Sequence, residues 1–410
     1  MIDVVFSELM GRPTQHHGGG NRIIYDIIKN ISSDEFSCRY FSYLCQMNID
    51  TLKTNLDLPT LSLKKKLGML AFVHLGVYKR IVSTPLYQRF YFKRVKRFFL
   101  AQSLRLETDI IHSHHPVALA YLSEHTSAKK ILTLHSKGGF AYEVRNSGSA
   151  KKLYEDDILE LSLQERKAVE RADYVTFPSI AAKNLFFEKN DAGCDDRKVR
   201  IVYNGVDLQY VSEIIPEPGA RQKYRLPSSA DLFILNVAEH SKQKHISLLL
   251  KVMKIIVHVY RKNSILVNVG EGPETSELRK MVEEFDLQKN VFFLGSLPNR
   301  EVIGLMKLCD CFVLTSENVV FDLVVLEALA CGAAVFLSDD GGNREIISNG
   351  VNGYLLQNKS EEQIAKSLME YDRVRIKKEA QRSVAKYSID SMVRSYEQLY
   401  HEAMDDGYSA

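Results

Sequence analysis

The chain alternates short apolar runs with longer segments of helical periodicity, and the runs tend to end at Gly, Asn, Asp, Ser or His. Such a run predicts a buried strand, and the helical segment after it predicts a crossover to a parallel neighbour. We predict strands in the first half at residues 2–7, 36–44, 109–114, 130–135, 174–178 and 199–203. In the second half we predict them at residues 232–238, 265–269, 291–294, 311–314 and 334–337. The fold class is therefore α/β, built on parallel sheets.

The pattern fails between Asp207 and Asp231, a stretch that contains Gly219 and three prolines. We place a domain linker there. A chain of 410 residues suits two domains, each able to bury its own core. The predicted division is a domain at residues 1–207, a linker at 208–230, a domain at 231–386 and a C-terminal helix at 387–410.

Composition narrows the class of protein further. With 45% apolar and 26% charged residues the chain is an ordinary globular protein, and a net charge of +3 indicates no particular partner. The six cysteines lack the spacing of a zinc site or a disulfide framework, which favours a reducing cytosol. The amino terminus lacks a signal peptide's basic start, and no apolar run reaches the length of a membrane span. We expect a cytoplasmic protein that can touch a membrane without crossing it.

Local charge departs from this balance in one place. Residues 58–105, the basic segment, contain eleven Lys or Arg and no Asp or Glu. On a helix, this pattern gathers four basic side chains on one arc, opposite an aromatic face: Arg89, Lys93, Lys96 and Arg97. The pattern predicts binding to an anionic membrane surface. The alternative is a core helix with a solvated basic face; the segment lacks any recognisable nucleic-acid-binding module.

Glycines and histidines after the first strands are the next candidates. Gly18, Gly19 and Gly20 open a helix and could present N–H groups to a phosphate, or could form a flexible turn. They do not match the dinucleotide fingerprint, and no P-loop motif occurs. His112 and His114 alternate onto one face of a strand and His115 onto the other, which argues against a shared metal site.

The densest signal runs from residue 308 to residue 353. A strand ends there at Thr315, a helix begins near Phe321 and carries Glu327, and Gly341-Gly342 opens the next helix. Two helix N-termini beside one carboxylate form a cradle suited to a nucleotide diphosphate, with phosphates on N–H groups and ribose hydroxyls on the carboxylate.

At this point the sequence resembles the family 4 glycosyltransferases of bacterial polysaccharide assembly, such as that of lipopolysaccharide or capsule. Motifs in the family's order carry the resemblance: DIIHSHH from Asp109, ILTLHS ending at Ser136, ADYVTFPS from Ala172, VYNGVD from Val202, VGEGPE from Val269 and FFLGSLP from Phe292. The resemblance implies a GT-B fold, in which an N-terminal acceptor domain and a C-terminal donor domain, both Rossmann-like, face a cleft. It further implies hexosyl transfer with retention of anomeric configuration and without a metal ion or other cofactor. The substrates implied are a nucleotide diphosphate sugar, with a UDP-sugar favoured, and a lipid-linked glycan.

The resemblance also assigns site residues. Glu327 matches the glutamate that holds the donor ribose, Lys244 matches the lysine that neutralises the diphosphate, and Leu323 belongs to the same donor set. Gly19 and Gly20 match a glycine loop that closes over the diphosphate. His135 matches a histidine that faces the transferred sugar; its alternative role is that of a strand-end histidine with satisfied hydrogen bonds.

Three positions depart from the family's pattern. Val319 stands where a glutamate is usual, Asp322 replaces a glycine, and Glu239 replaces an arginine. We predict that Asp322 supplies the missing carboxylate; alternatively, it caps the helix that follows. Glu239 either points away, pairs with Lys242 or Lys244, or contacts a donor hydroxyl. The rival functional hypothesis is a catalytically degenerate GT-B subunit that binds or stabilises an active partner.

Overall fold

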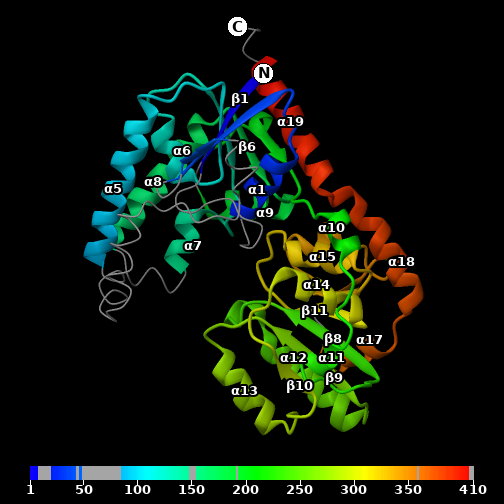
Figure 1. Cartoon of the computed structure of the whole chain (residues 1–410). Coiled ribbons are helices and arrows are strands. Elements are labelled where there is room, and N and C mark those ends of the chain that lie inside the picture. Colours follow the sequence, from blue (N-terminus) through cyan, green and yellow to red (C-terminus); the bar gives the residue numbers. More distant parts are fainter. Residues whose placement is uncertain are drawn as a thin grey trace. The chain divides into compact units, whose positions relative to one another are not determined.

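The computed structural model describes residues 1–7, 20–42, 46–48, 85–146, 154–190, 193–357 and 360–405. Gly18, Gly19 and most of the basic segment lie outside these residues. The chain divides into two compact units, Met1–Tyr203 with Met392–Ala410 as unit 1 and Asn204–Ser391 as unit 2. Each unit is an α/β structure, as the alternating pattern predicts (Figure 1).

In the described part of unit 1, seven strands form one sheet in the order β3-β2-β1-β4-β5-β6-β7. Their bounds are β1 Ile2–Ser7, β2 Phe36–Phe41, β3 Gln46–Asn48, β4 Ile110–Ser113, β5 Lys129–Thr133, β6 Tyr174–Phe177 and β7 Val199–Ile201. The pairs are parallel except for β2 with β3. The strand patterns missed β3, because three residues with two polar side chains carry no apolar run.

The described part of unit 2 holds six strands in the order β10-β9-β8-β11-β12-β13. Their bounds are β8 Leu232–Val237, β9 Ser264–Val269, β10 Val291–Phe293, β11 Cys311–Leu314, β12 Ala334–Ser338 and β13 Tyr354–Leu356. All pairs are parallel, and β13 is the strand that the apolar pattern missed. A core that includes Ile234, Leu249 and Phe336 joins the sheet to its helices.

The helices follow the crossovers (Figure 1). Those of unit 1 are α1 Gly20–Asn30, α5 Pro85–Ser103, α6 Pro116–Leu122, α7 Phe140–Asn146, α8 Glu155–Arg171 and α9 Ile180–Lys189. Those of unit 2 are α10 Leu208–Glu213, α11 Ala220–Lys223, α12 Ile246–Lys254, α13 Thr275–Glu284, α14 Asn299–Leu308, α15 Leu323–Ala330, α16 Asn343–Ile346, α17 Glu361–Met369 and α18 Arg373–Ser383. The proline-containing stretch 208–230 lies within unit 2 and holds α10 and α11.

The last helix, α19 (Ile389–Asp405), begins in unit 2 and continues into unit 1, where it is the red helix of Figure 1. Tyr396 and Tyr400 of this helix are buried in unit 1. Glu397 accepts a hydrogen bond from the backbone N–H of Ser32, at 2.8 Å. The end of the chain therefore belongs to the core built by its beginning.

Candidate active site

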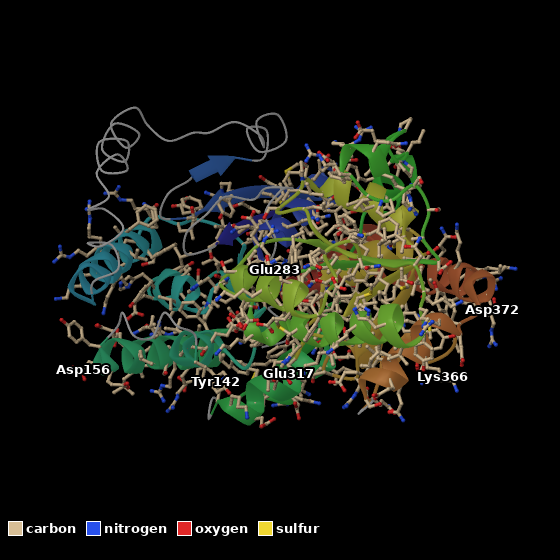
Figure 2. The ribbon with its side chains drawn as sticks, turned by 90° about the horizontal axis from the view of Figure 1, so that it is seen from below. Tyr142, Asp156, Glu283, Glu317, Lys366 and Asp372 are labelled. Atoms are coloured by element: carbon tan, nitrogen blue, oxygen red, sulfur yellow. The ribbon has the colours of Figure 1, made fainter. Side chains whose placement is uncertain are left out.

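Lys244 is positioned by two loops at the carboxyl ends of β8 and β11. It ends a short 3₁₀ turn, Lys242–Lys244, and the next residue, His245, has a left-handed backbone with φ of 48°. The hydroxyl of Thr315 donates to the carbonyl oxygens of Lys244 and His245, at 2.9 and 3.1 Å. Glu317, labelled in Figure 2, lies 3.0 Å from Nε2 of His245. The position of Lys244 therefore depends on the loop after β11 as well as on its own.

Asp322 is the ion-pair partner of Lys244. Its Oδ2 lies 3.4 Å from the lysine Nζ, and both side chains are partly exposed. Asp322 occupies the N-cap position of α15, but its side chain makes no capping hydrogen bond. The carboxylate is therefore held beside the lysine charge and does not cap the helix.

Glu327 lies on the same helix, five residues beyond Asp322, which is about 7.5 Å along the axis at 1.5 Å per residue. It is 4% exposed. Its Oε1 accepts a hydrogen bond from Nδ2 of Asn299, at a distance of 2.9 Å. Asn299 is the first residue of α14. Our sequence analysis missed Asn299, although it directly follows the motif FFLGSLP.

The two helix N-termini of the predicted phosphate cradle differ in the structure. Helix α15 begins at Leu323, two residues after the predicted start. Within the described residues, the backbone N–H groups of Leu323 and Val324 have no hydrogen-bond partner. Both residues are only partly buried, so their N–H groups remain able to bind an anion.

The second predicted N-terminus, that of α16, already has a hydrogen-bond partner within the protein. This corrects our expectation that it binds a phosphate. Helix α16 has four residues, and the N–H of Gly342 donates to the carbonyl of Val319, at 2.9 Å. A Cβ on Gly341 would lie 2.0 Å from that same carbonyl oxygen. These glycines are therefore required for the two loops to pack together, and the predicted anion-binding role is left to the N-terminus of α15.

The other departures from the family's pattern have different surroundings. The side chain of Val319 is buried at 4% exposure. Glu239 is exposed and, among the described residues, forms no ion pair with Lys242 or Lys244. Of the three predicted arrangements for Glu239, its pairing with either lysine is therefore wrong for this structure.

In unit 1, His135 follows β5 and lies beside His114, which follows β4. His114 Nδ1 and His135 Nε2 are 2.8 Å apart, and the rings stack with centroids 5.0 Å apart. Burial lowers the pKa of His135 to about 4 and that of His114 well below its usual range, with repulsion from the neighbouring histidines adding to the latter. Both rings are therefore neutral at pH 7.

The loop after His135 is held by a buried carboxyl. Gly138 and Gly139 turn the chain with φ values of 76° and 101°. Glu165 of α8 then accepts hydrogen bonds from the N–H groups of Phe140, at 2.6 Å, and Ala141, at 3.3 Å. Burial raises the pKa of Glu165 to about 7. The hydrogen bonds that this carboxyl accepts therefore help to shape the loop that carries His135.

The predicted basic helix is present as α5, which contains Arg89. Lys93, Lys96 and Arg97 are exposed, whereas Val95 and Phe99 are fully buried. Lys96 has an acidic neighbour that the local sequence does not reveal: its Nζ lies 3.7 Å from Glu160 of α8 and 5.5 Å from the ring centre of Tyr121. Part of the basic face is thus neutralised within unit 1.

The helix predicted after the glycines is present as α1. Gly20 is the first residue of α1. The predicted apolar stripe is buried: Ile23, Ile27 and Ile28 lie on α1, and Ile31 directly follows its last residue. The described part of the chain contains no cluster of three His, Cys, Asp or Glu side chains that could hold a metal ion. No helix in that part is both long and apolar enough to span a bilayer.

The fold and these motifs define a glycosyltransferase. The model of the Glycosyltransferase Family 4 matches residues 17–210, and that of the Glycosyl transferases group 1 matches residues 220–388. Together they span most of the chain, which belongs to glycosyltransferase family 4 and has the GT-B fold.

Individual proteins agree with this assignment. N-acetyl-alpha-D-glucosaminyl L-malate synthase of Bacillus anthracis is 25% identical over 320 residues, covering 74% of this chain and 77% of that protein. A Campylobacter jejuni enzyme, N-acetylgalactosamine-N,N'-diacetylbacillosaminyl-diphospho-undecaprenol 4-alpha-N-acetylgalactosaminyltransferase, is 29% identical over 44% of this chain and 46% of its own. The structure of Anabaena HepE with UDP and glucose matches with a TM-score of 0.69 at 18% identity, over 98% of this chain and 100% of that one.

Proposed function

We propose that this glycosyltransferase moves a hexose from a nucleotide diphosphate sugar, with UDP as the favoured nucleotide, to a lipid-linked glycan. Transfer retains the anomeric configuration and uses no metal ion. The observation that carries the donor half is that Lys244 lies beside Asp322 at the N-terminus of α15, the helix that also carries Glu327. The HepE structure, which contains UDP and glucose, supports the choice of nucleotide.

Lys244 and the N-terminus of α15 stabilise the leaving diphosphate. Negative charge grows on the bridging oxygen as the sugar bond breaks, so a fixed cation and oriented N–H groups lower the barrier. Lys244 supplies the charge, and the N–H groups of Leu323 and Val324 supply donors. Bound diphosphate then replaces the Asp322 carboxylate as the partner of the lysine ammonium.

Glu327 holds the ribose hydroxyls, because an ionised carboxylate is a strong acceptor at a buried position. Asn299 fixes one carboxylate oxygen, which reduces the freedom that the side chain must lose on binding. Asp322, released from Lys244, is the carboxylate that balances positive charge on the anomeric carbon, a role for which Val319 has no suitable group.

The acceptor half of the proposal rests on unit 1. The family resemblance assigns His135 to the transferred sugar and Gly19 and Gly20 to the diphosphate; of the two glycines, Gly20 is the first residue of α1. The printed name of the Campylobacter relative specifies a diphospho-undecaprenol glycan, which supports a lipid-carried acceptor here. The basic face of α5 brings the enzyme to the anionic inner face of the cell membrane, where such an acceptor lies.

Thermal unfolding in the presence of UDP-, GDP- and TDP-sugars tests the donor proposal. A donor present at 100 times its dissociation constant adds about 2.7 kcal/mol to stability. Stabilisation by a UDP-sugar, followed by its slow hydrolysis, supports the assignment. A chain that no nucleotide sugar stabilises, and that raises the activity of a second glycosyltransferase instead, is the degenerate subunit.

A further inference from the structure

Three histidine rings lie in a row at the carboxyl ends of β4 and β5. The centroids of His112 and His114 are 4.5 Å apart, and those of His114 and His135 are 5.0 Å apart. The row places one fully buried histidine, His112, behind a second, His114, and leaves the half-buried His135 at its end.

Both ring nitrogens of His112 already have hydrogen-bond partners, so neither is available to His114. Nδ1 of His112 lies 2.7 Å from the hydroxyl of Tyr400, and its Nε2 lies 2.7 Å from that of Thr133. His114 consequently bonds in the other direction, through Nδ1 to Nε2 of His135 at 2.8 Å. Nε2 of His114 is buried and has no partner among the described residues.

The proton of the His114–His135 bond can be assigned from this arrangement. Each neutral ring carries one N–H, so in this hydrogen bond one ring must donate and the other must accept. If His135 donated, the proton of His114 would be on Nε2, as a buried N–H for which the described residues provide no acceptor. Such orphaned donors are rarer in proteins than unpaired acceptors. His114 therefore carries its proton on Nδ1 and donates it to His135.

This assignment determines what His135 offers to a ligand. Its Nε2 is an acceptor, so the proton of the neutral ring is on Nδ1. That nitrogen has no partner among the described residues and is not among the buried unpaired atoms. His135 consequently presents an N–H donor and no basic lone pair to the space beside it.

We propose that His114 is a positioning residue that holds the proton of His135 on Nδ1, so that His135 donates a hydrogen bond to an oxygen of the sugar substrate. This inference rests on the proposed function only for the identity of that oxygen. The tautomer itself is a property of the enzyme without substrate.

Nitrogen-15 NMR of the histidine-labelled full chain measures the tautomer directly. In the wild type we expect His135 to be protonated on Nδ1 and His114 on Nδ1. His114→Asn keeps a donor near the same place and should leave His135 unchanged. His114→Asp is nearly isosteric with that variant but offers an accepting carboxylate, so the proton of His135 should move to Nε2. A wild-type His135 protonated on Nε2 would overturn the assignment, whatever the variants do.

Activity measurements separate positioning from stability. We expect His114→Asn to keep kcat/KM for the donor sugar within about 3-fold, and His114→Asp to lower it by about 10- to 100-fold, as expected for loss of one hydrogen bond. The exposed His125, changed to Asn and to Asp, is the matched control and should change neither quantity. Equal losses in both His114 variants, with an unchanged tautomer, would assign His114 a structural role only. If the NMR result holds while no sugar nucleotide is used, the proposed function fails and the tautomer assignment stands.

Discussion

The hydroxyl of Tyr400 lies 2.7 Å from Nδ1 of His112, although 288 positions separate the two residues. This hydrogen bond joins α19 to β4 inside unit 1, where both residues are fully buried. It links the end of the chain to the histidine row of the candidate site.

Tyr400→Phe keeps the aromatic ring and removes this bond, which leaves Nδ1 of His112 buried without its partner. We expect unit 1 to lose about 1–3 kcal/mol of unfolding free energy. Urea unfolding followed by amide hydrogen exchange in β4 and β5 measures the change. The exposed Tyr260, changed to Phe, is the control. Equal stabilities for the two variants would mean that the Tyr400 bond has no net value.

Changing Lys244 to Ala and changing Glu327 to Ala should affect different kinetic quantities. Because we propose that Lys244 acts on charge that grows in the transition state, Lys244→Ala should lower kcat by about 10²- to 10³-fold. Glu327→Ala should mainly raise the donor dissociation constant, by about 1.5–3 kcal/mol per lost hydrogen bond. Steady-state kinetics and donor titration measure both effects. The control is the exposed Lys242, whose change to Ala should leave kcat and the donor dissociation constant unchanged. Full activity of the Lys244 and Glu327 variants would refute the donor site.

Asp322→Asn tests the substitute carboxylate. Since the side chain makes no capping hydrogen bond, the substitution should leave the melting temperature almost unchanged. It also frees Lys244 from its partner, so the donor dissociation constant should fall, while turnover falls because the carboxylate charge is lost. Near-normal turnover would exclude Asp322 as the substitute and leave Glu317 and Glu239 to be tested. Glu283→Gln, at an exposed position of α13, is the control for loss of charge.

Vesicle binding tests the basic face of α5. Changing Arg89, Lys93, Lys96 and Arg97 to Gln should release the chain from anionic vesicles, at about 1 kcal/mol for each basic residue near the surface. Lys96 should contribute least, because Glu160 already neutralises it. Four exposed basic residues of α18 provide a control with the same change of charge: Arg375, Lys377, Lys378 and Arg382. A wild type that does not bind such vesicles at low salt is evidence for the alternative, a core helix with a solvated basic face.

Glu165 should make unit 1 less stable as the pH rises. Its folded pKa, about 7, is above the unfolded value of about 4.5. As the pH rises, Glu165 therefore loses its proton in the unfolded state before it does so in the folded state. The free energy of unfolding should fall by roughly 3 kcal/mol between about pH 4.5 and 7. Glu165→Gln should flatten this part of the stability curve. Parallel curves for wild type and variant would show that Glu165 titrates normally.

The sequence by itself determined the repeating architecture of this protein. Alternating apolar runs and helical segments predicted the strands of both sheets, because a strand buried on both faces must be apolar along its length. It missed β3 and β13, which have only three residues each and lie at sheet edges, where pairing with a neighbour decides the conformation. Motif order and spacing also indicated the family and the positions of Lys244 and Glu327.

Tertiary structure alone decided which side chains meet. Asn299 holds Glu327, Asp322 pairs with Lys244, and Glu160 neutralises part of the basic helix, all between residues far apart in the chain. The row from His112 to His135 likewise forms only because β4 and β5 are neighbours in the sheet. Local periodicity specifies the face of a helix or strand on which a residue lies. How distant segments pack decides which side chain it meets there, and thereby which charges are paired and where a histidine proton lies.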